Sequence, residues 1–122
     1  MNVYEMPFAI GFHTGNHKVY ALSYGTSTMA VIDPVKGALL HTVKLDAQPS
    51  AVAVDSKTGK VYVAEQKTGN VAIYNGATYK LLGKVRCGTI PYAMAADSQT
   101  GKVFVANMFS NDVTVITGEK KP

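Results

Sequence analysis

Histidine and cysteine are the side chains of this chain best suited to bind a metal or act as nucleophiles. His13 and His17 are four residues apart, a spacing that places two imidazoles on one face of a helix. A Thr-Gly-Asn stretch separates them, however, and predicts a turn between strands, so we expect two exposed turn histidines. His41 is predicted to be structural or solvated. Cys87 is the single cysteine, which excludes an internal disulfide, and we expect a part-buried, unreactive side chain.

Aspartate and aromatic residues recur at fixed offsets, which favours structural roles. Asp55 and Asp97 each begin a D-S-x-T-G-K stretch, where an aspartate side chain accepts backbone N–H bonds and fixes the turn. Tyr20, Tyr62 and Phe104 share one offset and are expected to pack between elements. The sequence also contains no nucleophile elbow, phosphate loop, dinucleotide fingerprint or H-E-x-x-H motif. We therefore predict no enzyme, with no catalytic residue, metal site or cofactor.

An internal repeat of 42 residues dominates the sequence. Pro7, Pro49 and Pro91 stand at this spacing, and the segments that follow them align without a gap. The later parts of the three units, M-A-V-I-D, V-A-I-Y-N and V-T-V-I-T, keep the same phase. A repeat of this length indicates that one supersecondary unit is stacked three times along the chain.

Each unit reads as four short strands joined by turns. In the middle unit, strands are predicted over residues 50–55, 60–65, 70–74 and 80–86, with alternating apolar residues and many valines. No segment has sustained helical periodicity. A four-stranded antiparallel sheet cannot bury both faces alone, and radial stacking of such sheets buries them. The first strand of each unit fits the crowded centre because its apolar residues are small, as at Ala51, Ala53, Ala93 and Ala95.

The repeat resembles the YVTN-type β-propeller repeats, which are related to the NHL and WD40 families. T-G-K-V-Y-V-A at 58–64, T-G-K-V-F-V-A-N at 100–107, M-A-V-I-D-P at 29–34 and G-x-x-P at 88–91 carry the resemblance. It implies an all-β propeller with blades at 7–48, 49–90 and 91–118. His13 and His17 stand where the other units have Asp and Gly, so we expect that turn to differ in shape. Propellers of this family resemble domains of quinone- and haem-dependent oxidoreductases and of surface proteins.

Three blades cannot close a ring, since propellers have about four to eight. Two chains could form a six-bladed ring, the chain could be a piece of a longer propeller, or an open stack could be capped by a partner protein. We favour self-association. Residues 1–6 are in phase with the end of a fourth strand, and the third unit stops near residue 118 without one. Residues 1–6 are therefore predicted to complete a blade.

Positions where the units differ are the candidates for recognition. They lie in the loops between second and third strands and in the connectors between units. The predicted ligand- or partner-binding residues are Tyr24, Glu65, Gln66, Tyr92, Met108 and Phe109. Two apolar residues in one predicted loop, Met108 and Phe109, favour a protein interface. These observations predict a binding or scaffolding module, and the alternative is a fragment or subunit of a larger oxidoreductase or surface protein.

Charge and hydrophobicity indicate which classes of partner and which locations are compatible with this chain. The formal net charge of +4 permits binding to anions, but the lysines are scattered over the units, which argues against nucleic acid. No apolar run approaches the roughly 18 residues needed to span a bilayer. The chain begins without a signal-peptide pattern, which indicates the cytoplasm if Met1 is the native start, whereas the family resemblance permits an extracytoplasmic location.

Overall fold

A computed structural model describes residues 7–15, 17–45 and 47–117. These residues form an all-β fold of 11 strands without a helix. The first sheet contains β1 (Pro7–Phe12), β2 (Val19–Ser23), β3 (Thr28–Asp33) and β4 (Ala38–Lys44). The second contains β5 (Pro49–Asp55), β6 (Lys60–Glu65), β7 (Asn70–Asn75) and β8 (Leu81–Arg86). The third contains β9 (Pro91–Asp97), β10 (Lys102–Asn107) and β11 (Asp112–Thr117).

Each sheet is an antiparallel meander that follows one 42-residue unit. The strands predicted for the middle unit agree with β5–β8 to within one residue at each end. The third sheet has three strands within the described part of the chain. Residues 1–6, predicted to complete a blade, lie outside the described residues, as do residues 118–122. No described helix is long and apolar enough to cross a bilayer.

The turns repeat with the sheets. Gly59 and Gly101 adopt φ angles of 79° and 76°, in the left-handed region that glycine tolerates best. His17 stands at the same position with φ 64°, and its N–H donates to the His13 carbonyl at 2.8 Å as the two glycines do to their aspartates. The histidine thus adopts the left-handed backbone of the two glycines. Strands β1 and β2 stop one residue further from the turn than β5 and β6 do, and residue 16 lies outside the described residues, so the expected difference in the shape of the turn stays a prediction.

Equivalent rows of side chains cross the three sheets. The register aligns Gly11, Tyr20 and Val31 in the first sheet. The corresponding rows are Ala53, Tyr62 and Ile73 in the second sheet, and Ala95, Phe104 and Val115 in the third. We call the side of each sheet that carries this row its front face, and the opposite side its back face. Because side chains alternate along a strand, valines such as Val52 and Val54 belong to the back face of the second sheet.

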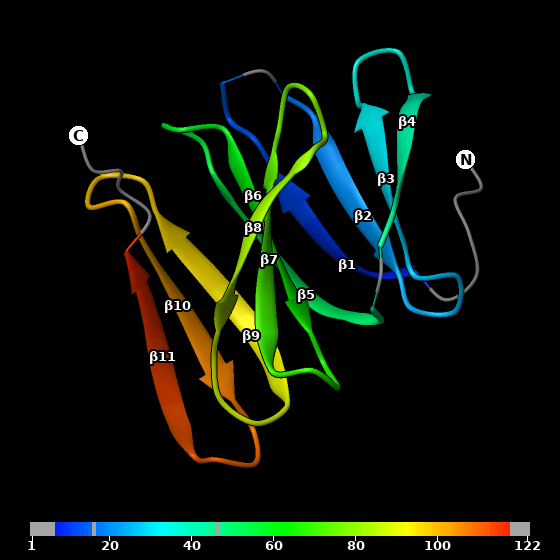
Figure 1. The fold of residues 1–122 in the computed structure, drawn as a ribbon. Helices are drawn as coiled ribbons and strands as arrows, with labels where there is room; N and C mark the ends of the chain where they lie inside the picture. Colours follow the sequence, from blue (N-terminus) through cyan, green and yellow to red (C-terminus); the bar gives the residue numbers. More distant parts are fainter. Residues whose placement is uncertain (1–6, 16, 46, 118–122) are drawn as a thin grey trace.

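The core lies between the sheets, where a front face meets the next back face. Tyr20 and Val31 pack with Val61 and Val63 in one cluster. Tyr62 and Ile73 pack with valines of the third sheet in the other. The first strands β1, β5 and β9 lie next to one another, while β4 and β11 lie at opposite sides of the view (Figure 1). The sheets are therefore stacked face to face and converge along their first strands.

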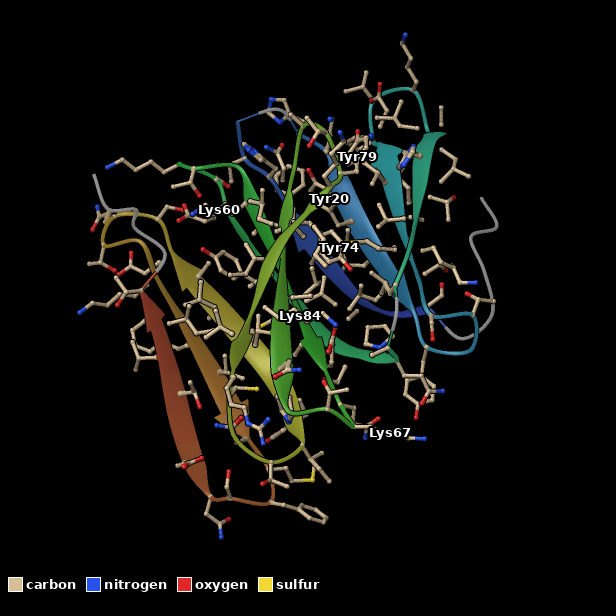
Figure 2. The ribbon with its side chains drawn as sticks, viewed as in Figure 1. Tyr20, Lys60, Lys67, Tyr74, Tyr79 and Lys84 are labelled. Atoms are coloured by element: carbon tan, nitrogen blue, oxygen red, sulfur yellow. The ribbon has the colours of Figure 1, made fainter. Side chains whose placement is uncertain are left out.

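Polar contacts fix neighbouring sheets in one register. The Tyr20 hydroxyl donates to the Gly76 carbonyl at 3.4 Å, and the Lys18 ammonium donates to the Tyr79 hydroxyl at 2.9 Å. Tyr20, Tyr74 and Tyr79 lie close together between the first and second sheets (Figure 2). His41 on β4 stacks on the Tyr79 ring with centroids 4.6 Å apart, which supports its predicted structural role. These residues tie the outer edges of the two sheets together.

Candidate functional site

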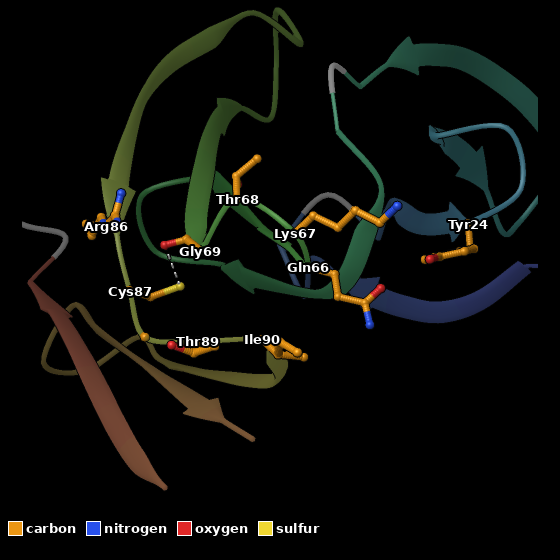
Figure 3. A pocket seen from close by; sticks show the side chains of 10 residues that line it. Tyr24, Gln66, Lys67, Thr68, Gly69, Arg86, Cys87, Thr89 and Ile90 are labelled. Carbon is orange, nitrogen blue, oxygen red and sulfur yellow. Dashed lines mark hydrogen bonds between the residues drawn. The ribbon is translucent and has the colours of Figure 1, made fainter. Parts of the chain in front are cut away.

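Two adjoining hollows lie where the first and second sheets and the connector to the third sheet meet. The first, of about 580 Å³, is lined by Tyr24 and by residues 66–69 and 86–90 (Figure 3). The second, of about 650 Å³, is lined by residues of β1, β5 and β9. Tyr24 and Gln66 line both hollows, so the two form one continuous depression. Its volume suits a small molecule or a few side chains of a partner.

The repeat explains why these residues meet. Tyr24, Gln66 and Met108 occupy the same place in the three units, immediately after the second strand. This strand end lies near the converging first strands, so each unit presents one side chain there. Tyr92, at the start of β9, is half exposed and lines the second hollow. The structure thus brings together Tyr24, Gln66 and Tyr92, three of the six predicted binding residues.

Glu65 lies beneath this surface. Its side chain is buried, its Oε2 pairs with the Lys84 ammonium at 2.9 Å, and its Oε1 accepts a hydrogen bond from the Thr68 hydroxyl at 2.7 Å. It lines neither hollow. The carboxylate therefore stabilises the β6–β7 turn and the outer strand β8, and we place it outside the contact surface.

Met108 and Phe109 are exposed beside the connector rather than in a hollow. The N–H of Met108 donates to the Ile90 carbonyl at 2.9 Å, and that of Phe109 donates to the Thr89 carbonyl at 3.2 Å. Their side chains are exposed, which leaves the prediction of a protein contact there open.

The end of the second strand carries a buried polar residue in every unit, a feature that the sequence reasoning missed. Ser23 and Asn107 occupy the positions that correspond to Glu65. The Asn107 amide donates to the Asp112 carboxylate at 3.1 Å and the Thr114 hydroxyl at 2.9 Å, and its Oδ1 accepts the Gly88 N–H at 3.1 Å. The shared offset was the available signal for the turn-fixing Glu65 and Asn107, whereas the buried Ser23 hydroxyl has no hydrogen-bond partner among the described residues.

Two cations in the first hollow were also missed. Lys67 and Arg86 line it, and within the described part of the chain neither side chain has an ion pair or hydrogen bond. Cys87 lies beside Arg86, is part-buried, and its thiol donates to the Gly69 carbonyl at 3.2 Å. Burial raises the pKa of Cys87 above its usual value of 9.0, while the Arg86 charge acts in the opposite direction.

The histidines are not placed for metal binding in the described residues, where no cluster of three or more His, Cys, Asp or Glu side chains occurs. The expectation of two exposed turn histidines was wrong for His13, which is buried; its Nδ1 accepts the Gly15 N–H at 3.0 Å. Its ring replaces the aspartate that accepts turn N–H bonds in the other units. His17 is exposed and lies against Phe12 with ring centroids 6.2 Å apart.

Comparisons with known proteins identify the fold alone. No family model matches the sequence, and no curated protein matches it. Among solved structures, hydrazine synthase of Kuenenia stuttgartiensis is similar, with a TM-score of 0.86 and 17% identity. The match covers 95% of this chain and 34% of that chain, so this chain spans about a third of its length. In all, 697 solved chains are similar, and a fold so widely shared does not specify a function.

Proposed function

We propose that this chain is a propeller-type binding module that closes its ring by pairing head to tail with a second copy. Two chains would supply six sheets, within the range of about four to eight found in propellers. The observation that carries the proposal is that the third sheet leaves open the face which is covered in the first and second sheets. The resemblance to YVTN-type repeats supports the same architecture.

The front faces of the second and third sheets carry similar apolar side chains but differ in how far these are buried. Tyr62 on the front face of the second sheet is 0% exposed, whereas Phe104 at the equivalent position of the third sheet is 40% exposed. Ala53 is buried and Ala95 is exposed. An exposed row of alanine, phenylalanine and valine is an apolar patch of the kind that marks an interface.

The opposite end of the stack exposes a matching back face. Ile10 and Phe12 of β1 are 70% and 47% exposed. Their counterparts in the second sheet, Val52 and Val54, pack so close to Gly11 that a Cβ built there would lie 3.3 and 3.0 Å from their methyl groups. If the sheet-to-sheet contact is repeated between two chains, Ala95 of one chain lies against Ile10 and Phe12 of the other.

Hydrogen bonds between the turns of neighbouring sheets follow the same repeat. The Thr14 N–H donates to the Ser56 hydroxyl at 3.0 Å, and the Ser56 N–H donates to the Ser98 hydroxyl at 3.2 Å. These residues are 42 apart, so each bond joins equivalent positions of successive sheets. A second copy in head-to-tail register offers its Thr14 hydroxyl to the Ser98 N–H. Each interface between copies would then repeat the contacts already made within the chain.

Charge substitutions on the two faces test this pairing. Ala95→Glu and Phe12→Lys each place a charge in the proposed interface, so each single variant should give single chains by light scattering. The double variant should recover association, since every interface then contains one glutamate opposite one lysine. Val35→Glu is the matched control, because Val35 is 86% exposed in the β3–β4 turn and on neither face. Association that survives both single substitutions would contradict the head-to-tail pairing.

A second candidate function follows from the structural comparison. Because the chain matches 34% of the hydrazine synthase chain, the open faces could instead be covered by further repeats of a longer oxidoreductase or surface protein. In that case the isolated chain should be a monomer, and the charge substitutions should leave its mass unchanged.

A further inference from the structure

Lys67 gives the first hollow a charge that the repeat does not explain, whereas Arg86 stands where the first unit has Lys44. Lys67 follows Gln66 in the β6–β7 loop, and the equivalent residues of the other units are Gly25 and Phe109. Arg86 ends β8 on the other side of the same hollow. No aspartate or glutamate lines it among the described residues.

The carboxylate nearest in sequence offsets these cations only in part. Glu65 is buried and its charge is balanced by Lys84 at 2.9 Å. At Cys87 the Arg86 charge lowers the thiol pKa and the Glu65 charge raises it, and the Arg86 effect is the larger of the two. A charged ligand group near Arg86 and Cys87 would experience the same attraction.

The wall of the hollow is held in place before any ligand arrives. The Cys87 N–H donates to the Gly69 carbonyl at 2.8 Å, and the Thr89 N–H donates to the Ser110 hydroxyl at 3.1 Å. The connector is thus anchored to the turn after β6 and to the loop after β10. Ile90 has φ 53°, a left-handed conformation that is costly for a β-branched residue and is found mainly where surrounding contacts impose it. A rigid wall lowers the entropy cost of binding.

The hollow also offers apolar and uncharged polar surface. Tyr24 lies at one end of the hollow, and Gln66, Lys67 and Ile90 lie between it and the end that carries Cys87 (Figure 3). Lys67 extends toward Tyr24, whereas Arg86 lies at the far end beside Cys87 (Figure 3). The hollow therefore combines positive charge with an aromatic wall, which suits a ligand with an anionic group and an unsaturated or aromatic body.

We propose that the first hollow binds a small organic anion, with its carboxylate or phosphate group held by Lys67, its body against Tyr24, and Arg86 adding attraction from the far end of the hollow. The site belongs to one chain and does not depend on ring closure. The observations favour a small molecule over nucleic acid because the two cations lie in a hollow of about 580 Å³, whereas the remaining lysines are scattered.

Titration with phenyl phosphate and benzoate, followed by amide chemical shifts at low salt, tests the site. Binding should shift the resonances of residues 66–69 and 86–90, weaken as salt is added, and slow alkylation of Cys87 by iodoacetamide. The Lys67→Gln/Arg86→Gln variant should bind at least about tenfold more weakly, because the anionic group loses its charge-assisted contacts. The control Lys57→Gln/Lys80→Gln removes the same charge from exposed turns outside the hollow and should bind as the parent does.

Several results would overturn the proposal. Millimolar phenyl phosphate and benzoate that shift none of these resonances would show that the hollow does not select organic anions. Equal weakening in the hollow variant and the control would mean that net charge attracts the probe. A single-stranded oligonucleotide that binds more tightly than either small anion would assign the cations to nucleic acid. Repeating the titration with Ala95→Glu, which leaves the hollow intact, separates this site from ring closure.

Discussion

The second and third sheets have nearly the same sequence pattern and different surroundings. The second sheet has neighbours on both faces, while the third has one on its back face alone among the described residues. Tyr62 is therefore fully buried, and Phe104, at the same place in the repeat, is 40% exposed. The sequence of a unit specifies an apolar front face, but what covers that face depends on the next sheet.

This difference separates two kinds of residue. Turn residues such as Asp55 and Asp97 accept backbone N–H bonds in both sheets, because a turn is completed within its own unit. Front-face residues complete their contacts only with a neighbour. The front face of the third sheet is thus left without a neighbouring sheet among the described residues.

The largest expected effect is a difference in unfolding free energy between substitutions on the two front faces. Tyr62→Ala should lower the free energy of unfolding by about 3–5 kcal/mol, because it leaves a cavity between two sheets. Phe104→Ala should cost about 1 kcal/mol or less in single chains, where the ring is partly solvated. Urea unfolding measures both losses of stability when each substitution is made in the Ala95→Glu variant, which is expected to stay monomeric. Equal losses would contradict the contrast between a covered and an open face.

A smaller effect is expected in the connector that joins these sheets. A Cβ on Gly88 would lie 2.6 Å from the Asn107 side chain, so Gly88→Ala must displace the buried amide. We expect a loss of about 1–3 kcal/mol, as for other overpacked sites. Gly83→Ala in β8 is the matched control, since no atom lies within 4 Å of its Cβ position. Thermal unfolding of both variants checks this, and a Gly88→Ala protein as stable as the control would show that the connector is not held against Asn107.

The smallest expected effect concerns Cys87 in the same connector. Burial raises its pKa, so the pH midpoint for alkylation should lie above that of the unfolded chain, and Arg86→Gln should raise it further. The folded protein holds this proton more tightly, so the associated stability is complete below the usual value of 9.0 and is lost as the pH rises through the folded pKa. Cys87→Ser should lack this alkaline loss. A midpoint equal to that of the unfolded chain would contradict burial of the thiol.

Much of the fold could be predicted because the repeat carries it. Strand boundaries in the middle unit follow from alternating valines and from glycines at left-handed turns, both local properties of the sequence. The burial of His13 was not predictable in the same way. It depends on an imidazole replacing an aspartate in a turn that faces the second sheet, which is a contact between units.

The candidate site was predicted in part for a similar reason. Variation at one repeat position pointed to Tyr24 and Gln66, and the structure places both in the hollows. Glu65 varies in the same way but points inward, since it ends a strand one residue before the exposed loop. Lys67 and Arg86 are far apart in sequence and line one hollow only because β6, β7 and β8 fold into one sheet.

The mass of the unmodified chain in solution tests the central claim most directly. Light scattering across a range of concentrations should give about twice 13.0 kDa, since each chain leaves one front face and one back face to be covered by its partner. A mass of 13.0 kDa at every concentration would contradict ring closure by two copies and would assign the open faces to further repeats or to a different partner.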